Sequence, residues 1–136
     1  MKMPKTKKYT QAVGRRKTAV ARVRLYKGKG ELIVNDLPIE RYFGASPAIR
    51  VVYEEPFKLT NTLGKFDLTV IVKGSGKSAQ LRALVHGIAR VLDKENDKHH
   101  SVLKQAGLLT RDSRERERRK PGLGGRARKR KQSPKR

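Results

Sequence analysis

The sequence predicts an α/β (α+β) body, in which helices pack on one face of a sheet of about four strands, followed by a long, extended, basic C-terminal tail. Three observations support this prediction. Some segments carry apolar residues at every second position, as strands do, and one carries them three and four apart, as a core helix does. The last 27 of the 136 residues contain a single large apolar side chain, Leu123. We therefore expect one globular body over residues 1–109 and a tail over residues 110–136.

The first expected strand runs from Arg15 to Tyr26, after a flexible basic arm over residues 1–14 that contains proline and glycine. Small and branched apolar residues occupy alternate positions of this strand, and Arg22 and Arg24 fall between them. Alternation by two places these arginines on the face opposite to the core. A solvated face is the simpler interpretation, but the basic residues that lead into the strand favour contact with RNA.

The next segment has the composition of a turn and a short strand. Lys27–Gly30 combines lysine with glycine, and Leu32–Val34 is apolar, so an antiparallel hairpin with the first strand is expected. Two short helices follow, over Leu37–Phe43 and Pro47–Tyr53. Proline suits the first position of a helix, and Ser46 suits its N-cap. We expect this segment to serve packing alone.

The second half of the body contains the clearest elements. Phe66–Val72 alternates as a strand, and a long helix from about Ser78 to Leu92 carries a stripe of core residues. On another flank of this helix Arg82, His86 and Arg90 stand four apart and are expected to form a cationic ridge. A second short helix is expected over Lys98–Ala106, where glycine follows as a stop signal.

The turn Gly74–Ser78 has some features of a nucleotide phosphate loop. It is too short for one, because Ile71 stands where the first glycine of that motif belongs. A glycine-rich turn before a helix still presents backbone N–H groups to an anion. An RNA phosphate is therefore the expected ligand, and a small phosphotransferase is excluded by the incomplete loop and the missing acidic metal ligands.

Charge gives the strongest indication of a partner. The chain has a formal net charge of +23, and its tail combines 13 basic residues with only three acids, Asp112, Glu115 and Glu117. Such a tail cannot bury enough apolar surface to fold alone, and it needs a polyanion to become ordered. Positive charge on body and tail indicates a nucleic acid contacted by both. We expect the three acids to pair with nearby arginines and to steady the point where the tail leaves the body.

Other function classes find little support. The chain has no cysteine, its three histidines do not form a metal set, and no nucleophile has an evident base, so we expect no catalysis, no cofactor and no metal. No apolar run approaches the roughly 20 residues that span a bilayer, and no secretory signal is evident. We expect a soluble, cytoplasmic protein without a membrane partner or small-molecule substrate. A nucleoid-type, DNA-compacting protein has similar charge and is the alternative.

Several motifs resemble the universal small-subunit ribosomal protein family numbered nine, in its bacterial form. The resemblance runs in register from about Tyr9 to Arg136. The motifs are Gly14–Val23 (GRRKTAVARV), Tyr42–Gly44, Lys73–Gly76 with Ser78–Gln80, His86–Arg90, Leu109–Asp112, Glu117–Arg118, Lys120–Gly122 and Lys135–Arg136. The sequence departs from the usual pattern at three places. Ser75 replaces a glycine, and Leu81–Arg82 replaces an alanine–glycine pair. Ser133–Pro134 follows the glutamine, where the family has an aromatic residue and then a serine.

The resemblance implies a fold similar to domain 2 of ribosomal protein S5 and a place in the head of the small subunit of a cytoplasmic, rather than an organellar, ribosome. It implies partners as well: small-subunit rRNA, neighbouring head proteins, and the peptidyl-site tRNA, which the tail approaches. The tRNA contact falls on Lys135 and Arg136. The residues expected to bind rRNA are Arg15, Arg16, Lys17, Arg22, Arg24, Lys73, Gly74, Gly76, Lys77, Ser78, Gln80, Arg82, His86, Arg90, Arg111, Arg114, Arg118, Arg119, Lys120, Arg126, Arg128, Lys129, Arg130 and Lys131.

Overall fold

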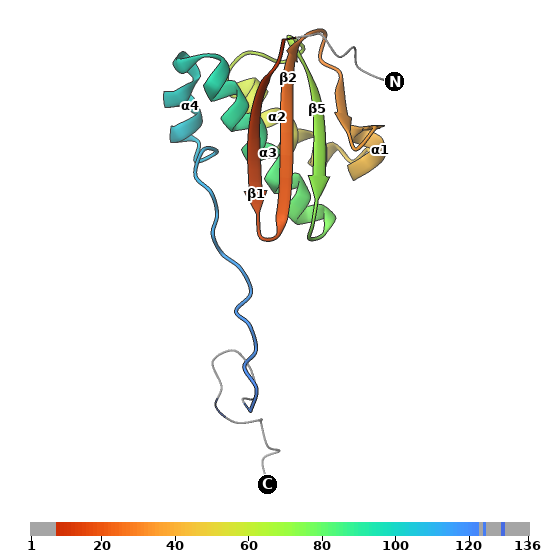
Figure 1. The fold of residues 1–136 in the computed structure, drawn as a ribbon. Helices are drawn as coiled ribbons and strands as arrows, with labels where there is room; N and C mark the ends of the chain where they lie inside the picture. The colour runs from red at the N-terminus through yellow and green to blue at the C-terminus, as the bar shows by residue number, and fades with distance from the viewer. Residues whose placement is uncertain (1–7, 123, 125–128, 130–136) are drawn as a thin grey trace.

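The body is a five-stranded mixed sheet with its helices on one face (Figure 1). The structure, a computed structural model, describes residues 8–122, 124 and 129. The strand order is β1-β2-β5-β3-β4. In chain order the elements are β1 (Thr10–Arg16), β2 (Ala19–Lys27), β3 (Leu32–Val34), β4 (Leu37–Pro38), α1 (Ile39–Phe43), α2 (Pro47–Leu59), β5 (Phe66–Lys73), α3 (Lys77–Glu95), a 3-10 turn (Asp97–His99) and α4 (His100–Gln105). The predicted fold class is confirmed.

The expected N-terminal arm is wrong over its last residues, because β1 begins at Thr10. This strand pairs antiparallel with β2 along its whole length, from Thr10 opposite Leu25 to Arg16 opposite Ala19. The segment that was expected to be a single strand from residue 15 therefore contains the end of β1, the hairpin turn and β2. The run from Thr10 to Val13 is too short and too weakly apolar to stand out beside the basic residues around it.

The expected hairpin between β2 and β3 is also wrong. β5 lies between them, antiparallel to β2 and parallel to β3. Asp67 on β5 holds the connection in place: its Oδ1 accepts the backbone N–H groups of Lys29, Gly30 and Glu31 at 2.9, 3.0 and 2.9 Å. The turn therefore carries the chain past the end of β5 and does not return it along β2.

The true partner of β3 is the two-residue strand β4, where a helix was expected to begin. Asn35 and Asp36 connect them with φ values of 47° and 65°, as the central residues of a type I′ turn require. The side chain of Asn35 also continues the sheet, because its amide donates to the Val72 carbonyl at 3.0 Å and accepts the Val72 N–H at 2.9 Å. The first helix consequently starts at Ile39.

The other helices agree with the prediction in position but differ in length. α2 starts at Pro47 as expected and continues to Leu59, beyond Tyr53, because Phe57 in its last turn is buried in the core. Ser46 occupies its N-cap position, although its side chain makes no capping hydrogen bond. α3 extends the predicted helix at both ends.

The core lies between the sheet and α3, whose Leu84, Ile88 and Leu92 are fully buried. The helix approaches the sheet most closely at two glycines. A Cβ atom added at Gly14 on β1 would overlap the Ala83 carbonyl oxygen and the backbone of Gly87 on α3. Backbone therefore packs against backbone here, and this contact fixes the β1–β2 hairpin against the helix.

Candidate nucleic-acid interface

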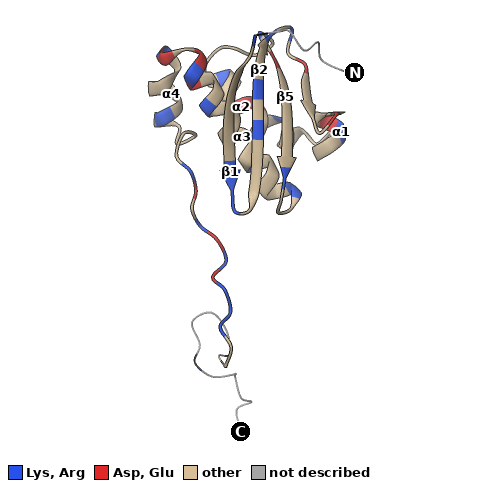
Figure 2. Ribbon diagram, viewed as in Figure 1, with Lys and Arg blue, Asp and Glu red and all other residues tan. Residues whose placement is uncertain are grey.

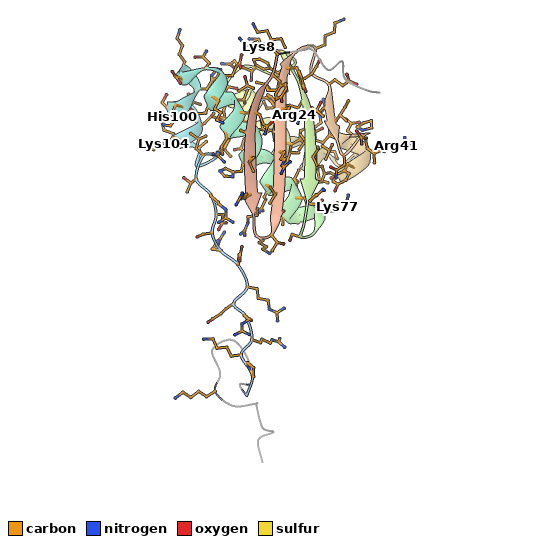
Figure 3. The ribbon with its side chains drawn as sticks, in the orientation of Figure 1. Lys8, Arg24, Arg41, Lys77, His100 and Lys104 are labelled. Atoms are coloured by element: carbon orange, nitrogen blue, oxygen red, sulfur yellow. The ribbon has the colours of Figure 1, made fainter. Side chains whose placement is uncertain are left out.

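No described helix covers the second face of the sheet (Figure 1), and basic residues occur on the strands β1, β2 and β5 (Figure 2). We call Arg15, Arg22, Arg24 and Lys73 the open-face cluster; all four are exposed. Val20 pairs with both Arg15 and Lys73, so these two basic residues stand on the same face in one row across the sheet. Arg24 lies on β2, toward the end of the sheet that is marked by Lys8 (Figure 3). The predicted outward orientation of the β2 arginines is confirmed.

A shallow hollow at the start of α3 brings a second group of predicted residues together. The β1–β2 turn contributes Arg16 and Lys17, the latter with φ of 52°, and α3 contributes Arg82. Ser75, Gly76 and Ser78 line the remaining side. No side chain caps the backbone N–H groups at this helix end, so the hollow combines them with three cationic side chains.

Two residues predicted to bind RNA, Lys77 and Gln80, follow the glycine-rich loop and connect it to Tyr42. Gln80 is buried; its amide donates to the Gly74 carbonyl at 3.0 Å and its carbonyl accepts the Tyr42 hydroxyl at 2.8 Å. The ammonium of Lys77 lies 3.2 Å from the centre of the Tyr42 ring, an arrangement that stabilises a cation. The Tyr42 motif, expected only to pack, thus holds the loop in shape.

The three residues of the expected cationic ridge on α3 do not form one continuous surface, because they contact different parts of the molecule. Arg82 faces the hollow, whereas Arg90 and Lys94 donate to the carbonyls of Val13 and Gln11 at 2.5 and 3.1 Å. These carbonyls lie on the edge of β1 that pairs with no described strand. The helix thereby covers an edge that would otherwise be open to pairing with another chain.

His86, the middle residue of the expected ridge, connects the edge of β1 to the base of the tail. Its Nδ1 accepts the Arg15 backbone N–H at 3.2 Å, so its Nε2 carries the hydrogen that is donated to the Leu109 carbonyl at 3.3 Å. Burial lowers the pKa of His86, and the nearby charge of Arg90 lowers it further. The residue therefore contributes a neutral link and no positive charge.

The base of the tail is fixed to the body by a cluster of three side chains that we call the arm clamp: Arg16, Asp112 and Arg114. Arg16 is 13% exposed; it donates to the Arg114 carbonyl at 2.6 Å and lies 3.5 Å from the Asp112 carboxylate. Arg114 pairs with the same carboxylate at 2.8 Å. Hydrogen bonds from Arg114 hold the pKa of Asp112 well below its usual range. The predicted pairing of the tail acids with nearby arginines is confirmed for Asp112.

The other two tail acids, Glu115 and Glu117, form no ion pair with any residue that the structure describes. Beyond the arm clamp the chain extends away from the body (Figure 1), and its basic side chains are exposed as far as Lys120. Lys129 is exposed as well. The remaining predicted tail contacts, Arg126, Arg128, Arg130, Lys131, Lys135 and Arg136, lie outside the described residues.

Within the described part of the chain, no three histidine or acidic side chains are grouped so that they would hold a metal ion. Among the same residues, no helix has the length and apolarity needed to cross a bilayer. The fold and its exposed cationic side chains define the class of the protein first: a small, strongly basic α+β protein.

Comparison with known proteins defines the family. Residues 14–136 match the model of the ribosomal protein S9/S16 family. The chain is 48% identical to the small ribosomal subunit protein uS9 of Maridesulfovibrio salexigens over 88% of its length and 92% of the relative's. It is 49% identical to the protein of that name from Solidesulfovibrio magneticus and 46% identical to that from Dehalococcoides mccartyi, over 82% and 85% of its length and 85% and 86% of theirs.

The chain therefore belongs to the ribosomal protein S9/S16 family. It is a structural, non-enzymatic protein of the small ribosomal subunit.

Proposed function

We propose that the body docks on small-subunit rRNA through the open-face cluster and the hollow at the start of α3. Both surfaces present exposed cations, and the hollow adds the backbone N–H groups of a helix end. Contacts of this kind are made mainly with phosphate groups, which orient a protein on RNA without reading its sequence. The surfaces lie on either side of the β1–β2 hairpin and would hold it between RNA segments.

The tail, in this proposal, threads through the rRNA beyond the arm clamp. The observation that carries this part is the clamp itself, because Arg16 and Asp112 fix where the tail starts while the described cations beyond Arg114 stay exposed. Fixing the base gives the tail one direction of exit. An extended cationic chain can then lie between phosphates of neighbouring RNA strands and reduce their repulsion, becoming ordered as it binds.

The end of the tail, in the same proposal, contacts the peptidyl-site tRNA through Lys135 and Arg136. At about 3.3 Å per residue the tail would reach roughly 90 Å when fully extended. The proposal therefore separates two roles, assembly for the tail as a whole and tRNA binding for its last two residues.

These roles are tested with small subunits reconstituted from three forms of the protein: the full chain, a chain without residues 135–136, and a chain without residues 110–136. Loss of the last two residues should leave incorporation intact, weaken peptidyl-site tRNA binding and flatten its log–log salt dependence by roughly 0.7 per lost phosphate contact. Loss of the whole tail should reduce incorporation, measured as occupancy after sedimentation at high salt.

A matched control removes two positive charges elsewhere, with Lys98→Gln in the 3-10 turn and Lys104→Gln in α4, both of them exposed residues of the body. This variant should bind tRNA as the full chain does. Equal tRNA affinity for the full and the shortened chain at several salt concentrations would refute the proposed tip contact. The DNA-compacting alternative predicts instead that the free protein binds duplex DNA as tightly as rRNA at physiological salt.

A further inference from the structure

A second hollow, of about 350 Å³, lies where β1 begins and β2 ends, at the end of the sheet away from the β1–β2 turn. Its volume is at the lower end of the range for small-ligand pockets, roughly 300–1,000 Å³. Lys8 marks this end of the molecule in Figure 3. The lining residues that matter here are Lys8, Tyr9, Tyr26, Lys27, Phe66 and Glu95.

Tyr9 forms the exposed wall of this hollow. Its side chain is 46% exposed, whereas Tyr26 and Tyr53 are 7% and 4% exposed. The ring is nevertheless held in place: the Tyr26 ring lies 5.6 Å away, and the Arg24 guanidinium carbon lies 5.0 Å from the ring centre. Tyr9 and Tyr26 line the hollow, whereas Arg24 does not. An exposed aromatic ring fixed in this way suits stacking by a planar ligand.

The charged groups around the hollow are of both signs. Lys8 and Lys27 are exposed beside the aromatic side chains. Glu95 is the last residue of α3, an unfavourable place for a carboxylate because the helix C-terminus is itself partly negative. Its Oε2 accepts the Thr10 hydroxyl at 2.6 Å, and its Oε1 has no hydrogen-bond partner among the residues described. The hollow thus offers two cations for phosphate and one free acceptor.

We propose that this hollow binds an unpaired nucleobase of RNA, stacked on Tyr9, with the flanking phosphates at Lys8 and Lys27. The proposal rests on the body being an rRNA-binding surface, and it adds a base contact to the phosphate contacts. The Glu95 carboxylate accepts hydrogen bonds from N–H groups on the base. Guanine presents two such donors side by side on one edge, whereas uracil presents a single donor between two acceptors. The site therefore prefers guanine to uracil.

The combination argues against a ligand that is phosphate alone. A carboxylate beside a phosphate would repel it, and an aromatic wall would add nothing to its binding. A base with attached phosphates uses all the groups present: the ring, the two lysines and the acceptor. Because unpaired bases occur at fixed positions in a folded RNA, one such contact sets the register of the body along the RNA, which phosphate contacts alone leave undefined.

The test uses three single-stranded RNA heptanucleotides, each with uridine at six positions and guanine, uracil or an abasic sugar at the centre. All three carry the same phosphates, so the contribution of the basic tail is the same for each. At about 0.3 M salt, where phosphate attraction is partly screened, the full chain should bind the guanine oligonucleotide about tenfold more tightly than the abasic one.

Two substitutions complete the test. Tyr9→Leu keeps an apolar side chain but removes the aromatic face; it should abolish the tenfold difference, together with the quenching of tyrosine fluorescence by the guanine oligonucleotide. Glu95→Gln should reduce the preference for guanine over uracil and leave stacking in place. Unfolding followed by circular dichroism verifies that both variants remain folded.

Equal affinity of the full chain for the guanine and abasic oligonucleotides would overturn the base site while leaving phosphate binding intact. Failure to bind any of the three would contradict the proposed docking of the body on RNA as well. A guanine preference that survives Tyr9→Leu would place base recognition elsewhere and would also overturn the inference.

Discussion

The close contact between β1 and α3 makes Gly14→Ala the most informative single substitution in the body. The added methyl group would overlap the Ala83 carbonyl oxygen and the backbone nitrogen of Gly87, atoms that belong to the interior of a long helix. Side chains relieve such overlap by changing rotamer, but backbone atoms do not. Relief therefore requires α3 to move away from the sheet, which would disturb the contacts of Ile88 and its buried neighbours.

Overpacking of a core costs about 1–3 kcal/mol, and the rigid neighbours of Gly14 place this substitution at the upper end. A loss of about 3 kcal/mol, at roughly 4 °C per kcal/mol for a domain of this size, lowers the melting temperature by about 12 °C. Urea and thermal unfolding of the full chain, followed by far-ultraviolet circular dichroism, measure both quantities. Because Gly14 precedes the basic residues of the hairpin turn, incorporation into small subunits should fall as well.

Gly76→Ala is the matched control, because the same methyl group placed there meets no atom within 4 Å. Its effect should stay within about 1 kcal/mol, combining a less favourable N-cap residue with a less flexible unfolded chain. If Gly14→Ala is as stable as the control, the helix does not rest on the strand backbone at this point, and the packing described above is incorrect.

Two further predictions concern the base of the tail. Asp112→Asn should speed tryptic cleavage after Arg111 and Arg114, because the carboxylate that holds Arg114 loses its charge. Glu117→Gln is the control: it removes an acid that has no ion pair in the described structure, and it should leave the rate of cleavage unchanged. The folded-state pKa of His86 lies below its unfolded value, so the unfolded chain takes up the proton more readily and stability should fall as the pH decreases through about 6.5. Substitution by glutamine, which does not titrate, should flatten this part of the stability–pH curve, and an unchanged slope would exclude His86 as its origin.

The sequence predicted the elements whose pattern is long and regular. Alternation located β5 and also β2 with its outward arginines, and the apolar stripe located α3. Composition alone predicted a tail distinct from the body, and one acid of this segment pairs with arginine as expected. These features depend on residues close to one another in the chain, so a local pattern is sufficient to indicate them.

Strand order depended on contacts that no local pattern records. The insertion of β5 between β2 and β3 is fixed by one carboxylate, that of Asp67, which binds three backbone N–H groups nearly forty residues earlier in the chain. The strand over Thr10–Arg16 was concealed for a similar reason, since its pairing with β2 and its contact with Gly87 compensate for a weak strand pattern. Tertiary contacts here outweighed local propensity.

The expected ridge on α3 shows how the spacing of side chains can be predicted correctly while the groups that they contact are not. Four residues of helix rise about 6 Å, and two residues of strand advance about 6.6 Å, so side chains four apart match alternate backbone groups of an adjacent strand. His86, Arg90 and Lys94 meet the edge groups of Arg15, Val13 and Gln11 in that order. Some basic side chains of this strongly basic chain therefore donate hydrogen bonds to the chain's own backbone. They cover the free edge of β1. In the proposed function, the RNA contacts fall on the cations of the sheet face, around the hollow at the start of α3 and along the tail.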